Sequence, residues 1–147
     1  MSFANKMMES EQIRKILVPL DGSKNSLRGL NKAIYLALEH EAALVFIHVV
    51  HRLPKIKGKL VPEKGITLDD PTFLLTAEML AKKNDIPSSG RVIIGDPGHT
   101  IMDYANTHSI DLIVMGARGL SDFKKIFLGS VSSYVLQKAK VAVMIVK

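Results

Sequence analysis

The chain has 147 residues, 47% of them hydrophobic and 23% charged, which is the composition of one globular domain. It contains no cysteine, so disulfide scaffolds, cysteine zinc sites, iron–sulfur clusters and thiol catalysis are excluded. The net charge of +6 favours anionic partners, but the lack of tryptophan and an aromatic content of 5% argue against a single-strand nucleic-acid binder, which needs stacking surfaces.

The N-terminal residues lack the continuous apolar stretch of a secretion signal. We predict a flexible tail over residues 1–12, followed by a single domain over residues 13–147. The longest apolar run, residues 42–50, is far shorter than the ~18 residues that a membrane span needs. We therefore expect a cytoplasmic protein without a membrane span.

Short apolar runs and helical patterns alternate along the domain. We predict strands at residues 15–20, 43–50, 91–94, 111–115 and 141–146. We predict helices at residues 26–39, 70–84, 97–108 and 130–138, with a helical turn at 122–127. Ser23 or Asn25 is expected to cap the first helix. The basic segment 51–68 is expected to be a loop: a solvated surface, a lid over a polyphosphate or a docking patch for an acidic partner.

The predicted strands are apolar throughout, which indicates burial on both faces. Strands that alternate with helices favour an α/β fold, a doubly wound five-stranded parallel sheet with helices on both faces. Such sheets bind ligands beyond the carboxyl ends of the strands, where the winding reverses. The residues that follow each strand are therefore the candidates for a functional site.

The segment after the fourth strand has the strongest indication of a ligand. Gly116 and Gly119 allow a ligand to approach the backbone closely. Gly129 precedes the last helix, whose free N–H groups and positive dipole end favour an anion. The segment also carries hydroxyl and cationic side chains at Ser130, Ser132, Arg118, Lys124 and Lys125. The pattern is neither a P-loop nor a dinucleotide fingerprint, and a structural turn is the alternative.

The spacing Gly116-x2-Gly119-x9-Gly129-Ser130 resembles the G-x2-G-x9-G-[S/T] signature of the universal stress protein family. The likeness extends from about residue 13 to residue 146 through KILVPLDGS, FIHV, GDP, DLIVMGARG and LGSVSSYVL. It implies a Rossmann-like fold with strand order 3-2-1-4-5. Because the signature is that of the ATP-binding branch, it also implies an ATP cleft between strands one and four.

The resemblance implies a set of nucleotide-binding residues. Asp21 would lie by the nucleoside, Pro19 would line the pocket, and Val49 would present its backbone to adenine; a turn residue and a core residue are the alternatives for Asp21 and Val49. The ribose and phosphates would meet Met115, Gly116, Arg118, Gly119, Gly129, Ser130, Val131 and Ser132. ATP with Mg²⁺ or Mn²⁺ between its phosphates is the expected ligand, with AMP, ADP and cyclic AMP as alternatives.

Nothing in the sequence points to efficient catalysis, because Asp21 is the only carboxylate placed at the site and Asp96 fits a helix cap before Pro97. The histidines lack zinc spacing, and His48 is most simply a core residue. We expect a stress-response regulatory module, switched by nucleotide, for an unknown protein partner. The alternatives are a slow Mg-dependent ATPase or a constitutive dimeric interaction protein with structural nucleotide; nucleic-acid binding ranks last.

The last predicted strand would leave an apolar sheet edge, which invites pairing with another chain. In the family this strand commonly pairs antiparallel with its copy across a two-fold axis. We therefore expect a homodimer through Val141, Val143 and Ile145. A monomer whose edge is guarded by Lys140 and Lys147 is the alternative. The family often has proline where this chain has Ala142, which leaves the register of the dimer open.

Overall fold

The structure is a computed structural model that describes residues 2–51, 55–56, 59–60, 72–119 and 127–147. Its main sheet consists of β1 (Lys15–Pro19), β2 (Ala43–Val50), β5 (Ser88–Ile94), β6 (Leu112–Gly116) and β7 (Ala142–Val146). The order is β5-β2-β1-β6-β7 with every pair parallel, which is 3-2-1-4-5 when these strands are counted along the chain. The predicted fold and strand order are confirmed.

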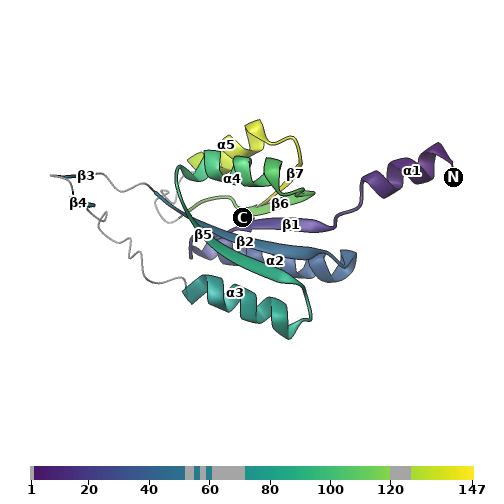
Figure 1. The fold of residues 1–147 in the computed structure, drawn as a ribbon, viewed down its shortest axis with the longest axis horizontal. Coiled ribbons are helices and arrows are strands. Elements are labelled where there is room, and N and C mark those ends of the chain that lie inside the picture. Colours follow the sequence, from purple (N-terminus) through teal and green to yellow (C-terminus); the bar gives the residue numbers. More distant parts are fainter. Residues whose placement is uncertain (1, 52–54, 57–58, 61–71, 120–126) are drawn as a thin grey trace.

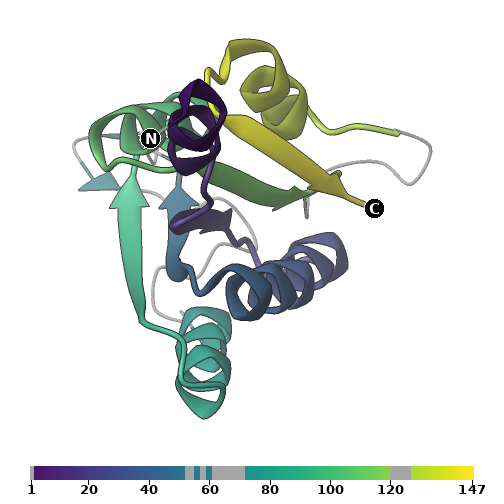
Figure 2. The same cartoon turned by 90° about the vertical axis from the view of Figure 1, so that its right-hand side faces the viewer.

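Helices cover both faces of this sheet. α2 (Lys24–His40) and α3 (Thr72–Lys83) lie on one face, and α4 (Pro97–Thr107) and α5 (Ser130–Lys138) lie on the other (Figures 1 and 2). Alternate strand residues fill the two layers: Val18 and Phe46 pack with α2 and α3, whereas Leu17 and Ile47 pack with α4 and α5. This arrangement explains why the strands are apolar throughout.

α2 shows how local sequence sets an element. Ser23 caps it, because its Oγ accepts the Ser26 N–H at 3.1 Å. Leu30, Ala33 and Ala37 recur at helical spacing and are buried against the sheet. The helix begins two residues before the predicted start at residue 26, since a cap at Ser23, rather than at Asn25, places the first helical residue at position 24.

Some elements differ from the prediction. β5 begins at Ser88 rather than residue 91, because it is an edge strand whose exposed start is polar and carries no apolar pattern. The short pair β3 (Lys55–Ile56) and β4 (Lys59–Leu60) lies in the segment expected to be a loop. The helical turn predicted at 122–127 and the cations Lys124 and Lys125 lie, apart from residue 127, outside the described residues, as does most of the loop 51–68.

The N-terminal segment contains a helix, α1 (Phe3–Ser10), where we predicted a flexible tail. It extends beyond the start of β1, away from the sheet (Figure 1), and its apolar side chains at Phe3, Met7 and Met8 are exposed. The flexibility of the segment stays a prediction. Within the described part of the chain, no helix combines the length and apolar character of a membrane span.

Candidate functional site

The winding of the sheet reverses between β1 and β6. The region beyond the carboxyl ends of these two strands is called the crevice below. The last β1–β6 pair is Leu17 with Ile113, whereas β6 stays paired with β7 as far as Gly116 and Val146. The β1–β6 ladder therefore ends before the β6–β7 ladder does. Doubly wound sheets bind ligands at such a point, and the cleft that the sequence predicts would lie here.

Pro19 explains why the β1–β6 ladder ends. In a parallel strand, the N–H groups of alternate residues point to opposite neighbours. The Leu20 N–H donates to the Ile47 carbonyl of β2 (2.8 Å), so an N–H on residue 19 would point toward β6. Proline has none, and the bond that would continue the ladder is missing. Pro19 thus ends the β1–β6 ladder at the crevice that it is predicted to line.

The backbone of Val49 extends past the end of β1. In a continued ladder the Val49 N–H would donate to the Leu20 carbonyl, but that carbonyl accepts from His48 Nδ1 (2.9 Å) instead. The Val50 carbonyl accepts from the Gly95 N–H on the β5 side, so the N–H and C=O of Val49 point to the β1 side. This geometry fits the expected backbone contact between Val49 and a nucleobase.

Asp21 begins the tight turn between β1 and α2. Its Oδ1 accepts the Ser23 N–H at 2.9 Å, and Gly22 has a left-handed φ of +81°. Asp21 is half-buried. The hydrogen bond makes Asp21 a turn-forming residue, and it also fixes the carboxylate at the crevice. A carboxylate has two oxygens and accepts several hydrogen bonds.

Ser23 connects the two loops of the crevice, a role that the sequence analysis missed. Its hydroxyl caps α2 and donates to the Arg118 carbonyl at 3.5 Å. A serine after Asp-Gly was enough to predict the cap. Its contact with a residue 95 positions away depends on how β1 and β6 lie in the sheet, and no local pattern encodes it.

Gly116 ends β6 beneath the first turn of α2. A Cβ at this position would lie 2.6 Å from the carbonyl carbon of Asn25 and 2.8 Å from the nitrogen of Ser26. Those are backbone atoms that cannot yield without moving the helix. The close approach of α2 therefore requires glycine at this position, and it brings the N-terminus of α2 beside the end of β6. Contact of Gly116 with a ligand stays a prediction.

The Ala117 carbonyl organises the connection from β6 to α5. It accepts the Gly129 N–H (2.7 Å) and the Ser132 hydroxyl (2.7 Å), which also lies 3.1 Å from the Gly129 carbonyl. Ser132 is 2% exposed, so its hydroxyl is committed to the backbone. Ser132 can offer an anion its N–H, while its side chain holds the glycine segments together.

The N-terminus of α5 has no side-chain cap. Gly129 is the N-cap residue and makes no side-chain bond, and its carbonyl accepts the Ser133 N–H at 2.9 Å. The N–H groups of Ser130, Val131 and Ser132 precede that bond, and N–H groups in the first turn of an α-helix have no intrahelical acceptor. Together with the positive end of the helix dipole, they make an end that favours an anion.

The other predicted site residues either pack in the core or follow β6 directly. Met115 is 5% exposed and Val131 is half-buried, and both pack in the apolar layer under α4 and α5. Their side chains belong to the core, so a ligand would meet their main-chain atoms. Arg118 and Gly119 are half-buried directly after Ala117, at the edge of the crevice.

Asp96 caps α4, as predicted, and is not part of the crevice. Its Oδ1 accepts the His99 N–H (3.0 Å) and pairs with His99 Nδ1 (2.8 Å). The hydrogen bond from the His99 backbone, followed by that from its side chain, holds the pKa of Asp96 below its usual value. The described residues bring together no set of three His, Asp or Glu side chains that fits a metal ion.

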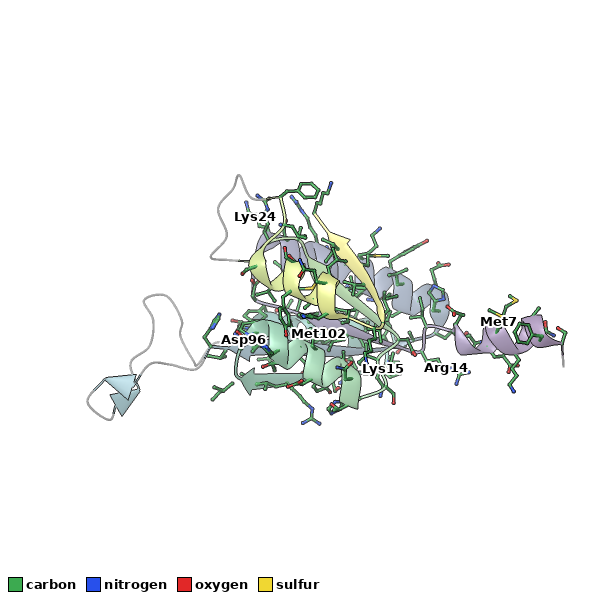
Figure 3. All side chains as sticks on the ribbon, turned by 90° about the horizontal axis from the view of Figure 1, so that it is seen from above. Met7, Arg14, Lys15, Lys24, Asp96 and Met102 are labelled. Atoms are coloured by element: carbon green, nitrogen blue, oxygen red, sulfur yellow. The ribbon has the colours of Figure 1, made fainter. Side chains whose placement is uncertain are left out.

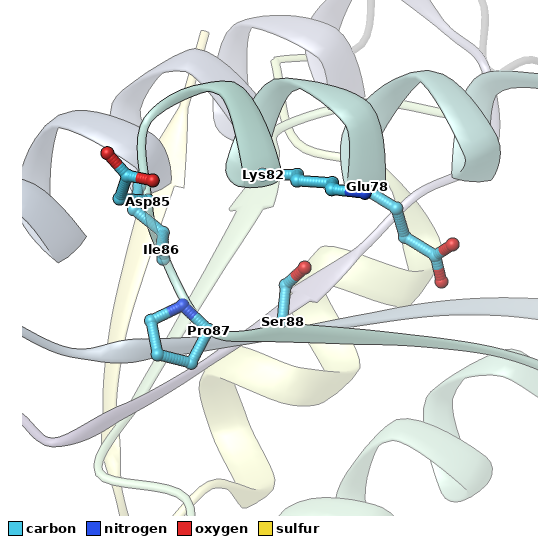
Figure 4. A pocket seen from close by; sticks show the side chains of 6 residues that line it. All are labelled: Glu78, Lys82, Asp85, Ile86, Pro87 and Ser88. Atoms are coloured by element: carbon cyan, nitrogen blue, oxygen red, sulfur yellow. The ribbon is translucent and has the colours of Figure 1, made fainter.

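A separate open groove of about 560 Å³ lies between α3 and the start of β5 (Figure 4). Glu78 and Lys82 of α3 border it, together with Pro87 and Ser88. Because it lies at the amino end of the strands, it is distinct from the crevice at their carboxyl ends. Figure 3 shows the same polarity, with Arg14 toward the amino end and Lys24 and Asp96 toward the opposite end.

β7 forms the edge of the sheet on the β6 side. The Val146 carbonyl accepts the Ala117 N–H, so the N–H groups of Val143 and Ile145, which alternate with it, point away from β6. Their side chains are half-buried against the layer under α4 and α5, together with Val141. The backbone donors, rather than these side chains, are what the edge presents to another strand.

Comparisons with known proteins give the family of this chain. The profile of the universal stress protein family matches residues 12–147. The universal stress protein Sll1388 of Synechocystis is 46% identical over 149 aligned residues, which cover 90% of this chain and 97% of that protein.

Solved structures share the fold. The universal stress protein UspA from Lactobacillus plantarum superposes with a TM-score of 0.70 at 26% identity, covering 92% of this chain and 99% of its own. A universal stress protein in complex with cAMP superposes with a TM-score of 0.67 at 27% identity, covering 91% of this chain and 96% of its own. A structural neighbour of this chain therefore binds an adenine nucleotide.

Proposed function

This chain belongs to the universal stress protein family, and we propose that it binds an adenine nucleotide, ATP with Mg²⁺ or Mn²⁺ foremost, in the crevice between β1 and β6. The observation that carries the proposal is the uncapped N-terminus of α5, which follows a glycine bonded to Ala117, directly after β6 and near the point where the β1–β6 ladder ends. The N-terminus of α5, which would bind the phosphates, thus lies next to the crevice, which would bind the nucleoside.

Each part of a nucleotide has a counterpart among the described residues. The phosphates would accept hydrogen bonds from the N–H groups of residues 130–132. The ribose hydroxyls would donate to the Asp21 carboxylate. The adenine edge would meet the backbone of Val49, which points toward the crevice.

The role that fits such a site is regulation rather than turnover. The described residues around the crevice supply hydrogen-bond donors and Asp21, without a set of metal ligands. Bound nucleotide would order the connection from β6 to α5 and so change a surface that a protein partner reads. A slow Mg-dependent ATPase, and a constitutive interaction protein that keeps nucleotide structurally, are the alternatives. A switch must bind its partner with different affinity when nucleotide is present.

The binding proposal is tested by purifying the protein without added nucleotide, denaturing it and identifying the released small molecules by mass spectrometry. Calorimetric titration of the ligand-free protein with Mg-ATP, ADP, AMP and cyclic AMP then gives the order of affinity. Saturable binding of an adenine nucleotide that Gly129→Val abolishes supports the proposal. An empty protein whose melting temperature ignores millimolar Mg-ATP contradicts it.

We also propose a homodimer through the β7 edge. The test is Val143→Pro, which removes an N–H that points away from β6 and so leaves the β6–β7 ladder intact. We expect a dimer for the wild type and a monomer for the variant in light scattering. A monomeric wild type, or a variant that stays dimeric, contradicts pairing through this edge.

A further inference from the structure

Phe73 lies against the turn that carries Asp21. It belongs to the first turn of α3 and is half-buried. Its Cδ1 lies 3.2 Å from the position that a Cβ on Gly22 would take, and its Cε1 lies 3.5 Å from it. The ring therefore fills the space that a side chain on the turn would need. Since Gly22 has a φ of +81°, this is a turn that only glycine adopts easily.

His48 of β2 also contacts the Phe73 ring. Its ring meets Phe73 edge-on, with centroids 4.9 Å apart and an interplanar angle of 89°. His48 Nδ1 donates to the Leu20 carbonyl at 2.9 Å, the last carbonyl before Asp21. Phe73 thus packs against the His48 ring, which bonds the carbonyl before the turn, and against Gly22 of the turn itself.

The orientation of the Asp21 carboxylate depends on that turn. Its Oδ1 accepts a local hydrogen bond from the Ser23 N–H at 2.9 Å. A hydrogen bond to a residue two positions away stays in place only while the intervening backbone keeps its shape. Phe73 supplies packing over that backbone, at Gly22, from a helix that begins 50 residues later in the sequence.

We propose that Phe73 is a positioning residue for ribose recognition: its ring holds the Leu20–Ser23 turn so that the Asp21 carboxylate accepts from the ribose hydroxyls. This inference rests on the proposed function and names the class of ligand that the site selects, nucleotides with a free ribose hydroxyl. A flexible turn would have to be ordered by the ligand itself, and that ordering costs binding free energy.

The test is a thermodynamic cycle between the protein and the ribose. Mg-ATP and Mg-2′,3′-dideoxy-ATP, which lacks both hydroxyls, are titrated into wild type and Phe73→Ala by calorimetry. We expect the wild type to prefer ATP by about tenfold, the worth of a hydrogen bond to a charged acceptor. Phe73→Ala should lose affinity for ATP but keep its affinity for the dideoxy analogue, so that the preference falls toward one.

Two further variants separate positioning from general stability. Leu74→Ala removes a buried neighbour on the same helix, 5% exposed, and should lower the melting temperature while the tenfold preference stays. Phe73→Leu keeps much of the apolar volume and serves as the test variant if Phe73→Ala does not fold. Its preference for ATP over the dideoxy analogue should lie between those of wild type and Phe73→Ala.

The outcomes are distinguishable. Equal preference for ATP in wild type, Phe73→Ala and Phe73→Leu overturns the role of Phe73 and leaves nucleotide binding standing. A Leu74→Ala variant that loses the preference as fully as Phe73→Ala also overturns it, because the effect would then be one of stability. A wild type that binds neither nucleotide refutes the proposed function, and the inference falls with it.

Discussion

The N-termini of α4 and α5 make an instructive contrast. Both follow strands of the sheet and lie on the same face, and both are preceded by glycine-containing turns. The N-terminus of α4 is closed: Pro97 has no N–H, and the Asp96 carboxylate accepts from His99. The N-terminus of α5 is open, because Gly129 has no side chain to bond the first turn.

The contrast shows that the absence of a capping side chain can be as important for anion binding as the presence of a donor. An aspartate cap satisfies donors and places a negative charge where an anion would otherwise bind. A glycine cap leaves both the donors and the dipole to a ligand. The positions of the two helices add to this difference, since α5 follows β6, whose ladder with β1 ends early, whereas α4 follows the edge strand β5.

The largest expected effect comes from giving α5 the cap that α4 has. Gly129→Asp should reduce nucleotide affinity by about 100-fold or more, because a fixed carboxylate would occupy the phosphate position. Calorimetry with Mg-ATP measures this loss. Gly129→Asn is the matched control, since it caps without charge and should lose less. Equal affinity of wild type and Gly129→Asp for Mg-ATP would contradict phosphate binding at the N-terminus of α5.

A second prediction concerns the crevice rather than the helix. Pro19→Val restores an N–H that points toward β6, so the β1–β6 ladder can extend toward Val114. We expect a gain in unfolding free energy of about 1 kcal/mol for the added hydrogen bond. Nucleotide affinity should fall about tenfold as the crevice narrows. Denaturant unfolding and calorimetry measure the two changes, and unchanged affinity would show that the separation of the strands is irrelevant to binding.

Ser132→Ala tests what keeps the open end in place. The variant loses the hydroxyl that donates to the Ala117 carbonyl at 2.7 Å. The expected cost in unfolding free energy is about 1 kcal/mol, because that carbonyl still accepts from the Gly129 N–H. Affinity for ATP should fall only a few-fold, since the N–H groups of the first turn remain. A loss as large as that of Gly129→Asp would mean that the hydroxyl itself binds phosphate.

The smallest effect is expected at α4. Asp96→Gly gives this helix the same cap residue as α5 and should lower the unfolding free energy by a few tenths of a kcal/mol. It should leave ATP affinity unchanged, because α4 starts at the edge strand. An Asp96→Gly variant that changes ATP affinity would contradict the placement of the site.

Asp96 also has a predicted pH dependence. Its pKa is lowered by hydrogen bonds from His99, so its carboxylate stabilises the native state at pH values above the unfolded pKa. That contribution is lost as the pH falls below about 4, through the lowered native pKa. Thermal unfolding of wild type and Asp96→Gly should therefore converge at acid pH. A difference in melting temperature that persists below the native pKa would contradict this cause.

The sequence predicted the parts of this molecule that rest on local patterns. Apolar runs located β1 and β2 well, because buried parallel strands need apolar residues on both faces. The start of β5 was missed, since its residues Ser88–Gly90 lie at an exposed edge. Likewise, Gly129 located the start of α5, because a helix start depends on few residues.

Contacts between segments distant in the sequence could not be predicted from local patterns. The clash that a side chain at Gly116 would make arises from α2, and the contact of Phe73 with Gly22 arises from α3. The sequence also suggested Ser132 as a hydroxyl donor to phosphate, whereas the structure commits that hydroxyl to the Ala117 carbonyl. Such roles follow from how strands are ordered in the sheet, which a single segment does not encode.

The most direct test of the account is to observe the helix ends themselves. Backbone amide NMR of the ¹⁵N-labelled protein during titration with Mg-ATP reports on both at once. The account predicts large downfield shifts for the N–H groups of Ser130, Val131 and Ser132, with those of Gly98 and His99 unmoved. Saturable binding that shifts the α4 amides, or that leaves the α5 amides in place, would contradict it.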